Sequence, residues 1–325
     1  MKLNENDYFI FDKPTESSII QFLRNIYHIP FLIYYKMLLN LCKPRKIIEK
    51  KYKVSICAIF KNEAAYLKEW IEYHRIAGIQ HFYLYNNNSE DDYQTILEPY
   101  IKENLVTLIQ WPHNQAQMEA YKDGIERFKD ETEWISFVDI DEFIVPVSND
   151  NIYEILKPFQ KNRPVVIGYW KMFGTSGKIS RNKNELVTQS FTVAWNKLTD
   201  VGKIFYNTAY SLDYSEVHCK TIHHYAWGKL GKTLLPPVNV FDKICMYGQN
   251  PIPKNKSIDF PLQINHYFTK TYEEYKQKKA KGDVYFKINP HDEEYFYFHE
   301  MKNLSEDYKI FKFIIKLKLA LGINE

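Results

Sequence analysis

The sequence lacks the glycine-rich motifs that bind nucleotides in two common classes of α/β protein. Neither GxGxxG nor GxxxxGK[ST] occurs in its 325 residues, which excludes the dinucleotide fingerprint and the P-loop. The four cysteines (Cys42, Cys57, Cys219 and Cys245) show no CxxC spacing, so they indicate neither a disulfide framework nor a zinc site. Such thiols are typical of a protein in a reducing compartment.

A strong excess of charge and a secretory signal are missing as well. The 43 basic residues nearly balance the 40 acidic ones, and a net charge of +3 does not predict a nucleic-acid partner. The N-terminus has no basic start followed by an apolar stretch, so no signal peptide is predicted. We therefore expect a cytoplasmic protein that does not bind nucleic acid.

Both ends of the chain are apolar and basic. In residues 1–52 the apolar run is interrupted by Pro30 and Lys36 and is shorter than the roughly 20 residues of a membrane span. We predict a helical leader there, first as a hairpin packed on the main domain and second as an interfacial membrane helix. Residues 286–325 predict another helical segment, with Lys309, Lys312 and Lys316 on one face. These ends raise the hypothesis of peripheral contact with the inner face of a membrane.

Strands alternate with helices in the intervening sequence. Apolar runs predict strands at 54–60, 81–85 and 105–111, and amphipathic patterns predict helices at 63–78, 93–103 and 115–130. This alternation predicts an α/β fold with a mainly parallel sheet flanked by helices, whose ligands bind beyond the carboxyl ends of the strands. Three polar clusters directly follow strands, and we expect them to open on one crevice: 61–63, 86–92 and 139–142.

Three carboxylates stand within the apolar sequence WISFVDIDEFIV, residues 134–145. A carboxylate buried in a strand costs several kcal/mol unless it is paired or bound to a cation. Asp139 and Asp141 are two residues apart, so in an extended chain they point to the same face and can bind one divalent ion, whose far side stays open to a phosphate. The alternative, an acidic surface turn, fits the apolar flanks poorly.

Five sequence blocks together resemble glycosyltransferase family 92. They are KNEAAYLKEWIEYHRIAGIQHFYLYNNNSEDD, QMEAY, WISFVDIDEFIVP, MFGTSG and INHYFTKTYEEYKQKKAKG, in this order between about Lys53 and Asp283. The resemblance implies a GT-A nucleotide-sugar fold, placed here at 53–285. It also implies an inverting transferase, dependent on Mn²⁺ or Mg²⁺, that moves a hexose from a UDP-sugar to a glycan hydroxyl. Galactose is the first expectation for the hexose, and cell-surface polysaccharide or lipopolysaccharide synthesis, with a glycan or glycolipid acceptor, is the expected setting.

The resemblance also implies roles for individual residues. Asp139 and Asp141 match the DxD motif, and His266 is expected as a third metal ligand, with a buried structural histidine as the alternative. Gln117 and Tyr121 equally fit core positions, and Asn86 stands where many relatives carry Asp. The residues expected to bind the nucleotide-sugar are Lys61, Asn62, Glu63, Asn86, Gln117, Tyr121, Gly174, Gly177 and Lys270, and Lys278 and Lys281 follow on the same segment.

The general base is less clear. Inversion needs a carboxylate within hydrogen-bond reach of the acceptor hydroxyl, and where relatives carry Glu this chain has Gln189. Glu185, Asp213 and Glu216 are the remaining candidates, and His218 is expected near the acceptor. Two other functions stay open. One is a metal-dependent nucleotide-sugar hydrolase or nucleotidyltransferase at the same acidic motif, and the other is a non-catalytic glycan-binding relative.

Overall fold

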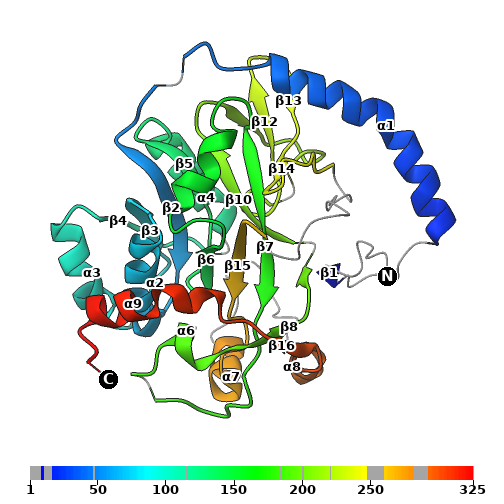
Figure 1. Cartoon of the computed structure of the whole chain (residues 1–325). Helices are drawn as coiled ribbons and strands as arrows, with labels where there is room; N and C mark the ends of the chain where they lie inside the picture. The colour runs from blue at the N-terminus through cyan, green and yellow to red at the C-terminus, as the bar shows by residue number, and fades with distance from the viewer. Residues whose placement is uncertain are drawn as a thin grey trace.

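A computed structural model of the chain describes residues 9–10, 17–46, 48–114, 116–182, 184–199, 201–219, 221–246, 260–280 and 292–324. Within these residues a nine-stranded sheet lies at the centre, with strand order β4-β3-β2-β5-β10-β7-β15-β6 and β14 paired to β7 (Figure 1). Its strands are β2 (Tyr52–Phe60), β3 (His81–Asn86), β4 (Val106–Gln110), β5 (Thr132–Ser136), β6 (Glu142–Pro146), β7 (Val165–Met172), β10 (Gly202–Asn207), β14 (Val238–Asn239) and β15 (Leu262–His266).

The first half of the sheet follows the predicted alternation. Helices α2 (Ala64–Ile76), α3 (Tyr93–Lys102) and α4 (Gln117–Phe128) connect β2, β3, β4 and β5, which pair in parallel. In α2 the buried Leu67, Trp70, Ile71 and His74 recur at the spacing of one helix face. The helix ends at Ile76, two residues before the predicted end at Gly78, which adopts a positive φ of 104°.

The second half of the sheet contains two reversed strands. β10 pairs antiparallel with both β5 and β7, β15 pairs parallel with β7, and β6 pairs antiparallel with β15. The carboxyl ends of β2, β3, β5 and β15 therefore share one edge with the first residues of β10 and β6. The predicted fold class, an α/β protein with a mainly parallel sheet flanked by helices, is confirmed.

The acidic motif departs from the prediction in one respect. An extended chain was expected at Asp139 and Asp141, but β5 ends at Ser136, residues 140–141 form a turn, and a separate strand, β6, begins at Glu142. The chain reverses between them, because β6 pairs antiparallel with β15 rather than continuing along β5. The carboxylates lie at this reversal.

The predicted N-terminal hairpin is wrong. Residues Ser18–Leu41 form one continuous helix, α1, with Pro30 inside it, and Figure 1 shows this helix extending along one side of the molecule. No Gly or Asn-Gly sequence, which could reverse the chain in a turn, occurs within residues 18–41. Leu32, Tyr35 and Leu39 pack on the core, and the Tyr35 ring meets the Trp227 ring edge-on at 5.1 Å. Among the described residues, no helix combines the length and apolar character of a membrane span.

The C-terminal segment packs on the main domain. A 3-10 helix, η3 (Lys309–Phe313), leads into α9 (Ile314–Leu321), which lies against α2. Phe313 and Leu317 are buried there. Helices α7 (Tyr272–Ala280) and α8 (Glu293–Glu300) lie near the carboxyl edge of the sheet in Figure 1. The predicted domain boundary at 285/286 lies outside the described residues.

The remaining elements are short. α5 (Ile152–Leu156) and η2 (Lys157–Phe159) follow β6, and α6 (Val187–Ser190) follows β7. Outside the central sheet, β11 (Ser211–Asp213), β12 (Trp227–Leu230) and β13 (Thr233–Leu235) pair with one another, β8 (Val193–Trp195) pairs with β16 (Asn303–Glu306), and β9 (Leu198–Thr199) pairs with β1 (Phe9–Ile10).

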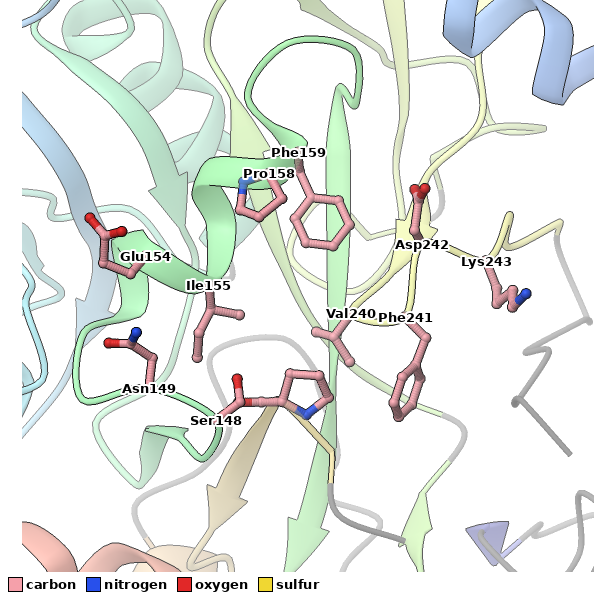
Figure 2. A pocket seen from close by; sticks show the side chains of 11 residues that line it. Ser148, Asn149, Glu154, Ile155, Pro158, Phe159, Val240, Phe241, Asp242 and Lys243 are labelled. Atoms are coloured by element: carbon pink, nitrogen blue, oxygen red, sulfur yellow. The ribbon is translucent and has the colours of Figure 1, made fainter. Parts of the chain in front are cut away.

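A hollow of about 500 Å³ opens beside α5 and η2 (Figure 2). Ile155, Phe159 and Phe241 form part of its apolar lining, and Ser148 lies just beyond the last residue of β6. Because β6 starts at the carboxyl edge and runs the opposite way, this hollow lies at the other edge of the sheet from the three carboxylates.

Candidate functional site

Core groups hold the three carboxylates in their turn. The backbone N–H of Asp139 donates to Glu142 Oε2 at 2.9 Å, and the Glu142 N–H donates to the Asp139 carbonyl at 3.0 Å. The buried indole of Trp70 in α2 donates to the carbonyl oxygens of both residues at 3.1 and 2.8 Å. The Tyr267 N–H donates to the Asp141 carbonyl at 2.9 Å. Contacts from α2 and from the residue after β15, together with the bonds between Asp139 and Glu142, thus fix the position of this turn.

A fully buried lysine binds two of the three acidic side chains. Lys203, the second residue of β10, places its Nζ 2.7 Å from Asp139 Oδ2 and 3.3 Å from Glu142 Oε2. Burial alone would lower the pKa of Lys203, but the two carboxylates outweigh it and raise the pKa, so the lysine is charged. Burial raises the pKa of Glu142 to about 8, although Lys203 opposes the shift. Lys203 was not predicted from the sequence. The only sequence feature that indicates a buried charge there is its position at the start of an apolar run.

Asp141 has a lysine and a histidine as its own partners. Lys278 Nζ, from α7, lies 2.5 Å from Asp141 Oδ2, and His266 Nε2 lies 3.7 Å from Oδ1. Burial would raise the pKa of Asp141, but Lys278 and His266 hold it well below its usual value. Lys278 differs from Lys203, because 40% of its side-chain surface is exposed. This lysine can therefore leave the carboxylate, whereas Lys203 cannot.

Gln117 and Tyr121 fix the second oxygen of Asp139. Gln117 Nε2 and the Tyr121 hydroxyl lie 3.2 and 3.3 Å from Asp139 Oδ1. Burial, and then the negative charge of Asp139, raise the pKa of Tyr121 well above its usual value, so its hydroxyl keeps the proton that it donates. Both side chains are buried and both contact the acidic motif. They therefore belong to the core and also line the candidate site.

A third lysine, Lys270, lies close to this group. Lys270 has a left-handed φ of 48°, is 5% exposed, and holds its Nζ 3.8 Å from the centre of the Tyr66 ring. Burial lowers the pKa of Lys270, with Glu63 and Asp141 opposing the shift. Tyr66 in turn donates to Glu274 at 2.7 Å. Lys281, near the end of the same segment, lies outside the described residues.

The first two polar clusters are joined to each other. The Asn62 N–H donates to Ser89 Oγ at 2.9 Å, and Asn62 Oδ1 accepts from the Glu90 N–H at 2.7 Å. Asn86 is buried and donates through Nδ2 to Tyr93 and Gln110. Both loops follow neighbouring parallel strands, so they lie at the same edge as the carboxylates. Lys61, the first residue of the first cluster, is exposed.

Comparison with known proteins identifies the family. The sequence model of glycosyltransferase family 92 matches residues 50–281, more than half of the chain. The chain belongs to glycosyltransferase family 92. A family 92 protein of Ricinus communis is 33% identical over 111 residues, which are 34% of this chain and 20% of that protein. A beta-1,4-galactosyltransferase of Caenorhabditis elegans is 34% identical over 115 residues, 30% of this chain and 27% of the nematode protein. The match thus spans about a quarter or less of each relative's length.

Solved structures are similar only at a low level. The S. aureus protein TarS in complex with UDP-GlcNAc is 16% identical, over 48% of this chain and 46% of that one, with a TM-score of 0.33. Glucosyl-3-phosphoglycerate synthase from Mycobacterium tuberculosis is 12% identical over 37% and 44%, with a TM-score of 0.27. These values are too low to carry an argument about substrate or site in this family 92 chain.

The donor groups at the acidic turn fit a divalent ion in part. Two carboxylates and an imidazole are ligands that Mn²⁺ accepts, and Mg²⁺ often takes one or two protein ligands with phosphate oxygens and water. Asp141 Oδ1 and His266 Nε2 are 3.7 Å apart, and neighbouring ligands of an octahedral ion with bonds of about 2.1 Å are roughly 3.0 Å apart, so a small side-chain shift would let both bind one ion. Asp139 faces Lys203, Gln117 and Tyr121 instead, and the described residues contain no ready group of three such ligands. Asp141 and His266 are therefore the pair that fits.

The two glycines of the MFGTSG turn have different surroundings. Gly174 faces Asn303 of β16 and Glu300 of α8, and the next residue, Thr175, donates from its N–H and its hydroxyl to Glu300 at 3.0 and 2.7 Å. Gly177 has a left-handed φ of 78° and open space where a Cβ would stand. The open position at Gly177 leaves room for a ligand, whereas Gly174 is required by packing.

Substitution of Gly174 by alanine tests this packing role. An added Cβ would lie 1.7 Å from Asn303 Nδ2 and 2.6 Å from Glu300 Oε1, so these side chains must move. We expect Gly174→Ala to lower the free energy of unfolding by about 1–3 kcal/mol, measured by urea denaturation. Adding Asn303→Ala should recover part of the loss. A Gly174→Ala protein as stable as the wild type would show that close packing of Asn303 and Glu300 does not require glycine at position 174.

The base candidates lie in different places. Glu185 is paired with Lys178 at 2.7 Å, and its carbonyl accepts from Arg181, which binds Glu274 beside Tyr66. The hydrogen bond from Lys178 lowers the pKa of Glu185. This network places Glu185 on the side of the site that Lys270 occupies. Gln189, in α6 two residues after Val187, is exposed.

Asp213 and His218 form a separate group. Asp213 Oδ2 is 2.7 Å from His218 Nδ1, and the Lys229 ammonium binds its other oxygen. In the described part of the chain, the hydrogen bonds and ion pairs of Asp213 and His218 do not reach Asp139 or Asp141. Figure 1 shows β12 and β13 beside α1, away from the arrowheads of β7 and β15. Glu216, in the same region, is exposed.

Proposed function

We propose that this chain is a metal-dependent inverting glycosyltransferase that moves a hexose, with galactose as the first candidate, from a UDP-sugar to a glycan hydroxyl. Family 92 membership supports the reaction class. The observation that carries the proposal is the pair of Asp141 and His266 at the carboxyl edge of the sheet, with Lys270 and Lys278 beside them. Carboxylate, imidazole and ammonium groups together suit a metal-bound diphosphate.

Each residue has a distinct part in this proposal. Asp141 and His266 would hold Mn²⁺ or Mg²⁺, with the partly exposed Asp139 as a further ligand. The bound ion would neutralise charge on the departing diphosphate. Lys278 would exchange its carboxylate partner for a phosphate oxygen, and Lys270 would bind phosphate as a point charge. Lys203 would stay in place and hold Asp139 and Glu142 in position.

The transfer itself needs a base and an acceptor. The acceptor hydroxyl oxygen forms a bond to the anomeric carbon as the bond from that carbon to UDP breaks, and a carboxylate accepts the hydroxyl proton. Among the three candidates we assign this role to Glu185, because its segment contacts the Arg181–Glu274 pair near Lys270. The nucleotide would lie against the joined loops that carry Lys61, Asn62 and Glu63.

Donor and setting are further parts of the same proposal. The galactose assignment is supported by the name of the nematode relative, whose match covers 30% of this chain. A glycan or glycolipid acceptor in cell-surface polysaccharide or lipopolysaccharide synthesis, and a peripheral position on the inner face of a membrane, fit the basic and apolar chain ends.

UDP release by the purified chain tests the proposal. UDP-galactose, UDP-glucose and UDP-N-acetylglucosamine are each offered with Mn²⁺ and a mixed glycan pool, beside an Asp139→Ala/Asp141→Ala variant. We expect one donor to give UDP release that needs both metal and acceptor and that the variant lacks. Release that ignores the acceptor would indicate a hydrolase or nucleotidyltransferase.

Gln189 favours a second candidate, a glycan-binding protein without transferase activity. A glutamine cannot accept the hydroxyl proton as a carboxylate does. If no donor gives UDP release, glycan-array binding by the wild type and the Asp139→Ala/Asp141→Ala variant decides the matter. Equal glycan binding by both proteins would support the binding role.

A further inference from the structure

Helix α1 has an apolar face that points away from the protein. Apolar side chains recur along it every three, four or seven residues, and each is between 49% and 74% exposed: Ile19, Leu23, Ile26, Ile33, Met37 and Leu41. At 100° per residue they share one side of the helix, and the residues that pack on the core, Leu32, Tyr35 and Leu39, lie on the other side. Such a large contiguous apolar surface in a soluble protein marks an interaction site.

The charge around this face identifies the kind of partner. None of the 40 acidic residues falls between positions 17 and 48, whereas Arg24, Lys36, Lys43, Arg45 and Lys46 all do. The rest of the chain is therefore slightly acidic. A second copy of the chain would bring two such basic helices together, which like-charge repulsion opposes. An anionic surface fits both the charge and the exposed apolar stripe.

We infer that α1 lies flat on an anionic phospholipid surface, with the stripe from Ile19 to Leu41 among the acyl chains and the basic residues at the headgroups. The helix of 24 residues is about 36 Å long, so its contact with the lipid is extended. Tyr27 and Tyr34, which are 66% and 56% exposed, lie at the margin of the stripe, where aromatic side chains favour the interface.

The C-terminal segment has a shorter exposed apolar face than α1, with Ile315 and Leu319 of α9, and two of its lysines are paired. Lys309 pairs with Asp307 at 3.0 Å, and Lys312 pairs with Asp150 at 3.0 Å. Phe313 and Leu317 are turned into the core. Membrane contact is therefore assigned to α1 rather than to both chain ends. This assignment does not depend on the transferase reaction.

Co-sedimentation of the full chain with lipid vesicles tests the inference. Vesicles of phosphatidylcholine with phosphatidylglycerol are compared with vesicles of phosphatidylcholine alone. We expect at least about tenfold tighter binding to the anionic vesicles, weakened by high salt. Ile26→Asp/Ile33→Asp should reduce this binding about tenfold or more, because two charges would enter the apolar interface. Both positions are exposed, so the unfolding midpoint and the UDP release in solution should stay unchanged.

A matched variant on α9 serves as the control. Ile315 and Leu319 are 68% and 69% exposed, and Ile315→Asp/Leu319→Asp should bind the vesicles as the wild type does. Two results would overturn the inference. One is wild-type protein that does not sediment with anionic vesicles, and the other is an Ile26→Asp/Ile33→Asp protein that binds them unchanged. A wild-type dimer in light scattering that this double variant converts to monomer would instead assign the stripe to a second copy.

Discussion

Replacement of Lys203 by methionine is expected to lower the free energy of unfolding by about 3–5 kcal/mol, because it leaves buried carboxylate charge without its partner. The Lys203 side chain has no exposed surface and binds Asp139 at 2.7 Å and Glu142 at 3.3 Å. Methionine has a similar length and keeps the packing, so the loss reports mainly the charge. Urea denaturation monitored by tryptophan fluorescence measures it.

An exposed ion pair provides the comparison for this variant. Lys178 binds Glu185 at 2.7 Å, and the two side chains are 35% and 40% exposed. Lys178→Met should change the free energy of unfolding by no more than about 1 kcal/mol, since solvent screens such pairs. Equal stability losses in Lys178→Met and Lys203→Met would contradict the role of Lys203 as the internal counter-ion of the acidic turn.

Local sequence patterns predicted the part of the fold that depends on neighbouring residues. The first three strands and three helices follow from apolar runs, amphipathic spacing and the glycine at position 78, all of which act over a few residues. The prediction that the polar clusters lie at one edge of the sheet needed one further rule, that parallel strands end on the same side of a sheet. Asp141 and His266 lie there together, although 125 positions separate them in the chain.

Long-range pairing was beyond the reach of these patterns. The reversed strand β10 enters between β5 and β7, and it brings Lys203 to Asp139 from 64 positions away. Nothing in the sequence around Lys203 encodes that partner. The N-terminal hairpin failed for a different reason: a stripe of apolar residues predicts that a face is covered, but it does not say whether the protein or another surface covers it.

Replacement of Asp141 by asparagine is expected to reduce the rate of sugar transfer by a factor on the order of 10³. Asparagine keeps the shape of the side chain but loses the charge that pairs with Lys278 and that would bind the metal next to His266. Transfer is measured as acceptor-dependent UDP release at saturating Mn²⁺. Binding of Mn²⁺ in the presence of UDP, followed by electron paramagnetic resonance, should weaken in parallel.

Asp213 offers a control with nearly the same surroundings. It is 5% exposed and bound by a lysine and a histidine, Lys229 and His218, as Asp141 is bound by Lys278 and His266. Asp213→Asn should therefore disturb the protein to a similar degree while leaving the transfer rate within a few-fold of the wild type. Loss of transfer in Asp213→Asn with Mn²⁺ binding intact would instead make Asp213 the base, because a residue that only supports the fold would not separate the two measurements.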